Sequence, residues 1–311
     1  MERNLSLDIL KICLAIFVVF LHTGFFYDIS KEISFLLVHG LFRIAVPTFL
    51  LITGYYFFLI TTKDKFFKWL SRVIILFLIW NIFYLPLWYD SKLPMVLFNA
   101  FNGYFVLWYL SGTAIAGCML FLLKEVKSKY LIISSLLIYI AGWLIQEIGN
   151  LHIFSGVIDT LLNFTPLHRN FFFICFPFLT LGFLLHKHQA YVNKFNINGR
   201  IISLCLIVLI IESYLNYTFI GQKEGLDQLL ILFFFVPVLF LYVLKLEIKG
   251  KNKDLASLST AIFLIHPLFL FLFKDYINKQ QITLFSFIVL SVSVLAGLFL
   301  VYINKRLKYI L

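Results

Sequence analysis

Charged residues are scarce in this sequence. Asp, Glu, Lys and Arg together make up 13% of the 311 residues, whereas apolar residues make up 62% and the mean hydropathy is +0.97. Soluble domains are only about half apolar and about one-quarter charged, so this composition excludes an ordinary soluble globular protein. It predicts an all-α polytopic membrane protein that has the lipid bilayer as the partner of most of its surface.

Cysteine pairs, long linkers and internal repeats are also missing. The four cysteines lie far apart in the sequence and form no CxxC motif, which argues against a metal site or a disulfide framework. They are Cys13, Cys118, Cys175 and Cys205. The longest predicted loop, residues 187–199, is too short to fold by itself. We therefore expect a single transmembrane domain over residues 1–311, with no separate soluble domain and no metal.

Long apolar runs are abundant. A helix needs about 20 apolar residues to cross the hydrocarbon core, and this length predicts about ten spans with short connections. The expected spans are 6–26, 34–60, 69–89, 104–123, 130–148, 168–186, 200–220, 227–245, 256–273 and 282–304. Residues 91–103 are apolar but too short to cross, so we expect them to lie at the membrane interface or to fold back.

The formal net charge of +11 is distributed unevenly. If the N-terminus is cytoplasmic, the loops on the same side carry most of the Lys and Arg residues, as in 63–72, 124–129 and 245–253. This bias predicts that both termini are cytoplasmic. It also accounts for the basic clusters, so no nucleic-acid partner is expected.

The first span carries three ionisable residues, Asp8, Lys11 and His22. At 100° per residue they fall on one stripe of the helix, with Lys11 and His22 about 16 Å apart along its axis. Ionisable groups at depth avoid lipid, so we expect the stripe to face the bundle interior or a wet cavity. Lys11 can reach the cytoplasmic headgroups and Asp8 can pair nearby, but that interpretation does not explain His22.

Two further spans carry buried ionisable residues. Arg43 lies near the middle of the second span, four residues from His39, where its side chain cannot reach an interface; this favours a functional role. His266 lies inside the ninth span, next to Pro267, which loosens the helix. A catalytic role and a structural hydrogen bond to another helix are both open for His266.

Five blocks of the sequence resemble the acyltransferase-3 family of integral membrane acyltransferases. The first block runs from Arg3 through "LDILK" to His22, although Lys11 stands where many members have arginine. The other blocks follow in the family's order. They are "FRIAVPTFLLITGYYF" (42–57), "LWYL" (107–110), "RNFFFICFPFLTLG" (169–182) and "LSTAIFLIHP" (258–267).

The resemblance implies an O-acetyltransferase in the bacterial cytoplasmic (inner) membrane. Such an enzyme moves an acetyl group from cytoplasmic acetyl-CoA, which is not permanently bound, to a hydroxyl of a surface polysaccharide such as O-antigen or a similar glycan. A thioester is already activated, so the enzyme needs a base and a group that stabilises the oxyanion. The residues expected in catalysis are His22, Arg43 and His266.

The resemblance also suggests where the two substrates bind. The expected CoA-binding residues are Arg3, Asp8, Lys11 and Arg72, and the expected acceptor-binding residues are Arg169, Asn170 and Trp108. Other polar residues gather between 146 and 168, and we interpret them as a solvated outer loop. They are Gln146, Glu147, Asn150, His152, Asp159 and His168.

Two other functional classes stay open. A membrane transporter or exporter also needs buried charges, but the sequence contains no second copy of the first-span stripe, and many transporters are built from repeats. A non-catalytic partner in polysaccharide assembly would use its polar residues only to hold helices together.

Overall fold

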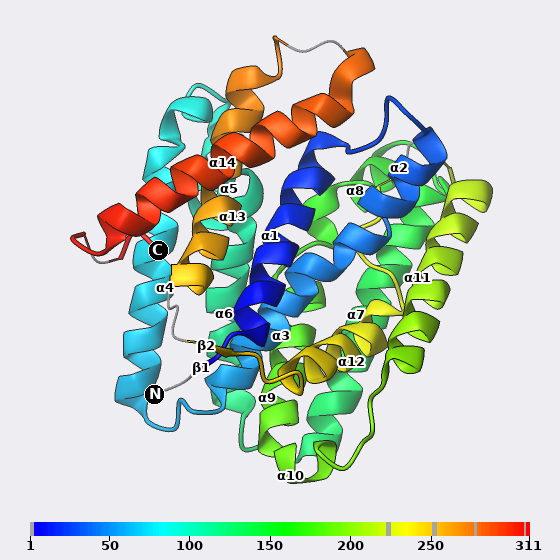
Figure 1. Cartoon of the computed structure of the whole chain (residues 1–311). Helices are drawn as coiled ribbons and strands as arrows, with labels where there is room; N and C mark the ends of the chain where they lie inside the picture. Colours follow the sequence, from blue (N-terminus) through cyan, green and yellow to red (C-terminus); the bar gives the residue numbers. More distant parts are fainter. Residues whose placement is uncertain (1–2, 222–224, 251–253, 277–278, 308) are drawn as a thin grey trace.

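The computed structural model describes residues 3–221, 225–250, 254–276, 279–307 and 309–311. Over these residues the chain is a bundle of helices with one two-stranded ladder (Figure 1). In that ladder β1 (Arg3–Asn4) pairs antiparallel with β2 (Lys249–Gly250). The pairing places the start of the first helix beside the segment that precedes α13. The all-α polytopic fold is confirmed.

Among the described residues, eight helical segments are long and apolar enough to cross a membrane. They are α1 (Ser6–Thr23), Lys31–Phe57, α4 (Lys63–Phe83), Phe105–Leu123, α7 (Ser128–Asn150), α11 (Gly199–Phe219), α13 (Asp254–Phe273) and α14 (Ile282–Asn304). Shorter apolar helices are Phe171–Lys187, α12 (Leu232–Leu244) and α5 (Leu93–Asn102). Each of the ten expected spans therefore has a helix, two of them short. The span count and the side of the termini stay predictions.

Small helical segments connect the long ones. They are the 3₁₀ helices η2 (Leu85–Leu87), η3 (Phe105–Leu107), η4 (Thr165–Leu167) and η6 (Lys279–Gln281), and the short α8 (Val157–Leu162) and α10 (Gln189–Val192). Helix α6 (Trp108–Leu123) continues directly from η3. A π-helix, η5 (Phe171–Cys175), leads into α9 (Phe176–Lys187).

The second span is broken, contrary to the continuous helix expected over 34–60. Helix α2 (Lys31–Val38) ends before Gly40, a 3₁₀ helix η1 (Leu41–Ile44) follows, and α3 (Ala45–Phe57) completes the crossing. A side chain at Gly40 would meet the Ser213 hydroxyl of α11 at 2.9 Å, so the small residue permits close approach at the break. The break places Arg43 in the 3₁₀ helix, where its side chain is largely buried.

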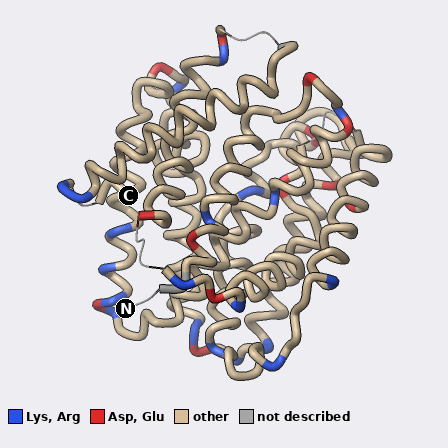
Figure 2. The backbone as a smooth tube through the Cα atoms, in the orientation of Figure 1, with Lys and Arg blue, Asp and Glu red and all other residues tan. Residues whose placement is uncertain are grey.

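Two glycines bring α3 and α9 into backbone contact. A Cβ atom on Gly54 would lie 1.9 Å from the Leu179 carbonyl oxygen, and one on Gly182 would lie 2.0 Å from the Leu51 carbonyl oxygen. Small residues of this kind let membrane helices pack closely. Helix α1 lies against α3, α13 and α14 (Figure 1). On its polar stripe Asp8 is buried, and Lys11 and His22 are partly buried. Figure 2 shows that charged residues are sparse within the bundle and more frequent at the ends of helices.

Candidate functional site

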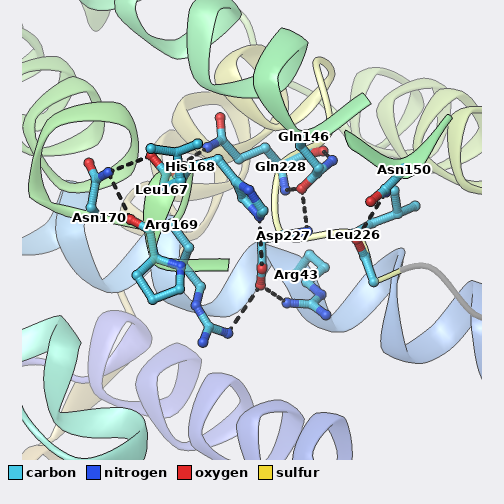
Figure 3. A network of polar contacts seen from close by, with 12 residues as sticks. Arg43, Gln146, Asn150, Leu167, His168, Arg169, Asn170, Leu226, Asp227 and Gln228 are labelled. Carbon is cyan, nitrogen blue, oxygen red and sulfur yellow. Dashed lines mark hydrogen bonds and ion pairs between the residues drawn. The ribbon is translucent and has the colours of Figure 1, made fainter. Parts of the chain in front are cut away.

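The helix break in the second span holds the side chain of Arg43 in place. Its Nε donates to the Val38 carbonyl oxygen at 3.2 Å, and its Nη2 lies 3.1 Å from Nδ1 of His39. Its Nη1 forms an ion pair with Asp227 (Figure 3). The backbone N–H of Leu226 also donates to Nδ1 of His39, at 3.2 Å. His39 therefore accepts at Nδ1 from two donors, which fixes the position of the guanidinium.

Asp227 joins two arginines from different elements. Its Oδ1 accepts from Arg43 and, at 3.4 Å, from Nη1 of Arg169. Its Oδ2 lies 3.5 Å from Nε2 of His168. The carboxylate is 9% exposed, and one negative charge faces two guanidinium groups. An ion pair this deeply buried stabilises the arrangement only while both partners are present.

The backbone around Asp227 is held by glutamine side chains. Gln146 Oε1 accepts from the N–H groups of Asp227 and Gln228 at 2.7 and 2.9 Å, and its Nε2 donates to the Gln228 carbonyl oxygen at 2.8 Å. Gln228 Nε2 donates to the His168 carbonyl oxygen at 2.8 Å (Figure 3). The carboxylate of Glu212 accepts from the backbone N–H groups of residues 230 and 231. Side chains from other helices therefore hold the backbone of this irregular segment inside the bundle, although the buried Oε1 of Gln228 has no hydrogen-bond partner among the described residues.

These contacts correct the interpretation of residues 146–168 as a solvated loop. Gln146 is fully buried, and Glu147, Asn150 and His168 are each less than a tenth exposed. The side chains of Gln146, Glu147 and Asn150 and the backbone carbonyl of His168 bind one another or the segment 225–228, because an unpaired polar group in the interior is costly. His152 and Asp159 alone match the solvated interpretation, with a 3.0 Å ion pair between half-exposed and partly exposed side chains.

His22 and His266 meet between α1 and α13. Their rings stack with centroids 5.5 Å apart and planes 19° apart. Pro267 has no backbone N–H, so the carbonyl of Phe263 loses its usual helical donor. The Nδ1 of His266 takes that place, 2.8 Å from the Phe263 oxygen and 3.2 Å from the Ile262 oxygen. His266 therefore donates from Nδ1 and keeps Nε2 as an acceptor, which has no hydrogen-bond partner among the described residues.

Two cavities lie along α1. The first, which we call the His22 cavity, has a volume of about 540 Å³ and is lined by His22, His39, Arg43, Trp108 and Arg169 among others. A narrow chamber shares His22 and both arginines with it and reaches Asp227. The second, which we call the Lys11 cavity, has a volume of about 270 Å³. It is lined by Lys11, Thr53, Tyr56, Tyr109, Ser259 and Thr260 among others.

Five of the ten expected site residues line these cavities, namely His22, Arg43, Trp108, Arg169 and Lys11. The guanidinium of Arg169 lies over the Trp108 ring, 5.4 Å from its centroid. Lys11 pairs with Asp8 at 3.6 Å, as the pairing interpretation of the stripe expected. His266 lines neither cavity and lies behind His22.

Three expected residues lie elsewhere or have other contacts. Asn170 caps η5, because its Oδ1 accepts from the N–H groups of residues 172 and 173 and its Nδ2 donates to the carbonyl oxygens of residues 166 and 167. Arg72 is exposed on α4 and lines neither cavity. Arg3 belongs to β1 through its backbone. Among the described residues, no group of three or more His, Cys, Asp or Glu side chains is placed to hold a metal ion.

Sequence reasoning missed Asp227, Gln228 and the role of His39. Asp227 falls at the expected start of the eighth span, where a charged residue looks like an ordinary helix end. The one sequence signal was an Asp-Gln pair directly before a long apolar run. The contacts of Asp227 with Arg43 and Arg169 form only in the folded protein, because these arginines are far away in the sequence. Chemically, the site combines an imidazole that can accept a proton with fixed cations that stabilise developing negative charge.

Comparisons of the sequence with known proteins identify a family and several longer relatives. A family model described as an acyltransferase domain matches residues 4–303. An amino-acid racemase of Enterococcus faecalis is 25% identical over 99% of this chain and 47% of its own length. A serine/alanine racemase of Enterococcus gallinarum is 26% identical over 85% of this chain and 40% of its own length. The chain spans less than half the length of these curated relatives. No solved structure matches the chain.

Proposed function

The chain belongs to the acyltransferase domain family, and we propose that this membrane acyltransferase moves an acetyl group from acetyl-CoA to a hydroxyl of a surface polysaccharide. The observation that carries the proposal is the His22 cavity, whose lining includes the imidazoles of His22 and His39 and the guanidinium groups of Arg43 and Arg169. A hydroxyl that enters this cavity meets both a base and fixed positive charge.

In the proposed reaction the acceptor hydroxyl attacks the thioester carbonyl. The oxygen–carbon bond forms, His22 takes the hydroxyl proton, and Arg43 stabilises the oxyanion that develops on the carbonyl oxygen. The intermediate then collapses, the carbon–sulfur bond breaks, and the CoA thiolate leaves and takes up the proton that His22 holds, which restores the base. We assign the base to His22. His39 also lines the cavity, but its Nδ1 already accepts from Arg43 and from the Leu226 N–H, and His266 lines neither cavity.

The Lys11 cavity suits the donor. It lies on the same helix as His22, toward the predicted cytoplasmic end, and its hydroxyl and lysine side chains match the amides and carbonyls of a pantetheine arm. We propose that Asp8 orients Lys11 at this cavity. Arg3 and Arg72 are proposed to contact the CoA phosphates, with Arg72 acting from the exposed face of α4.

The acceptor is proposed from the lining of the His22 cavity, and the membrane in which the protein lies is proposed from its relatives. Trp108 offers an aromatic face in the His22 cavity, and such faces suit sugar rings. Arg169 lies over that face, while Asn170 holds the helix start that positions Arg169. The relatives named above come from bacteria, which supports a bacterial cytoplasmic membrane. A surface glycan such as O-antigen is proposed as acceptor from the family resemblance.

The proposal is tested with inside-out membrane vesicles that contain the chain and labelled acetyl-CoA. Label that enters the extracted polysaccharide, and that is absent from vesicles without the chain, supports acetyl transfer. A transporter or exporter would instead move label into the vesicle lumen without linking it to glycan. A non-catalytic partner of polysaccharide assembly would change the amount of glycan but not its acetyl content.

A further inference from the structure

The His22 cavity has an unbalanced charge. Its lining includes Arg43 and Arg169 but no Asp or Glu side chain among the described residues. Asp227 reaches only the narrow chamber beneath, where it is 9% exposed. A ligand in the cavity therefore meets two cations, whereas their shared carboxylate lies behind them.

The two arginines differ in how completely they are paired. Arg43 has three partners, namely the Val38 carbonyl, His39 and Asp227. Arg169 has one hydrogen bond among the described residues, at 3.4 Å to the same Asp227 oxygen that Arg43 binds. Its side chain is 29% exposed, compared with 12% for Arg43. Because one carboxylate cannot neutralise two guanidinium groups, Arg169 presents uncompensated charge and unused N–H donors to the cavity.

The surroundings of Arg169 define the shape of a matching ligand. Its guanidinium lies over the Trp108 ring, 5.4 Å from the centroid, which orients the planar group. A planar fork of donors fits a carboxylate or phosphate better than it fits a neutral hydroxyl. His22 lines the same cavity, so an anion bound at Arg169 leaves the rest of the ligand beside the proposed base.

We propose that the acceptor is an anionic saccharide, whose carboxylate or phosphate binds Arg169 while one of its hydroxyls faces His22. This inference rests on the proposed acyl transfer, because it assigns the chemical class of the acceptor at that same site. It also gives Asp227 a role as a positioning residue, since its carboxylate holds both guanidinium groups but leaves one charge for the ligand.

The test is calorimetric binding to the purified chain in detergent, without any acyl donor. The probes are D-glucuronate, glucose 6-phosphate and the neutral methyl ester of glucuronate. We expect at least one anion to bind about tenfold or more tightly than the ester, the worth of one charge-assisted contact. The anion that binds more tightly shows whether Arg169 binds a carboxylate or a phosphate of the acceptor. If neither anion binds more tightly than the ester, the proposal is overturned.

Two variants test whether Arg169 causes the preference for the anion over the ester. Arg169→Gln should remove it, whereas Lys92→Gln, which removes an exposed cation outside the cavity, should retain it. An Arg169→Gln protein that keeps the preference contradicts the assignment. Coenzyme A that displaces glucuronate would assign the arginines to the donor and also overturn the proposal. The ester comparison uses the unmodified chain, so the result does not depend on whether Arg169→Gln folds. Because no acetyl-CoA is present, failure of this test and failure of acetyl transfer are distinguishable.

Discussion

The imidazole rings of His22 and His266 lie face to face, 5.5 Å apart and nearly parallel. His266 is fixed by its bonds to the Ile262 and Phe263 carbonyls, and its ring stacks on that of His22 and holds it in place. His22 lines the His22 cavity, whereas His266 does not.

This arrangement depends on Pro267. Replacing Pro267 by Ala restores a backbone N–H that competes with the His266 ring for the Phe263 carbonyl. We expect Pro267→Ala to lower the acyl-transfer rate about tenfold, because a misplaced support ring displaces the base. The matched control is Pro237→Ala, a proline inside α12 that lines neither cavity. Equal rates for the two variants would contradict the positioning role.

Asp227→Asn should destabilise the protein strongly. Removing one partner of a buried ion pair leaves uncompensated charge, at a cost of about 3–5 kcal/mol. The measurement is thermal unfolding of the purified protein in one detergent. Asp254→Asn is the control, because Asp254 pairs with Lys305 where both side chains are more than half exposed and the pair contributes about 1 kcal/mol or less. Similar shifts of the unfolding midpoint in both variants would show that the ion pairs of Asp227 do not stabilise the site.

Gly54→Ala tests the contact between α3 and α9. The added methyl group would lie 1.9 Å from a backbone oxygen, so the helices must separate. Overpacking of this kind costs about 1–3 kcal/mol, and we expect a lower midpoint of thermal unfolding. Gly199→Ala, at a helix start with nothing within 4 Å, should leave the midpoint unchanged or raise it slightly. An unchanged midpoint in Gly54→Ala would refute the close packing.

Lys11→Gln tests the proposed binding of acetyl-CoA in the Lys11 cavity. We expect KM for acetyl-CoA to rise about tenfold with little change in kcat, because a binding contact is lost before the chemical step. Lys11→Arg keeps the charge and should lie closer to the unmodified chain. Lys124→Gln removes a lysine that lines neither cavity and should not change KM. A fall in kcat at constant KM would move Lys11 from donor binding to catalysis.

The sequence predicts the fold class and part of the site because those depend on strong local signals. Apolar runs identify the spans, and the cost of buried charge singles out Arg43. The break at residues 39–44 escaped prediction because it does not change the hydropathy of the span, and the close approach of Ser213 in α11 to Gly40 is a contact between distant parts of the chain. Asp227 escaped because its partners, Arg43 and Arg169, come from distant parts of the chain, and one sequence contains no information on such contacts.

The most direct test of the account is acetyl incorporation into surface glycan extracted from cells that express the chain or His22→Ala at equal membrane levels. His152→Ala, which changes a half-exposed histidine in a loop, is the control. We predict that His22→Ala lowers incorporation by about a hundredfold or more, the usual contribution of a general base, while His152→Ala keeps it. Equal incorporation by His22→Ala and the unmodified chain would contradict the assignment of His22 as the base.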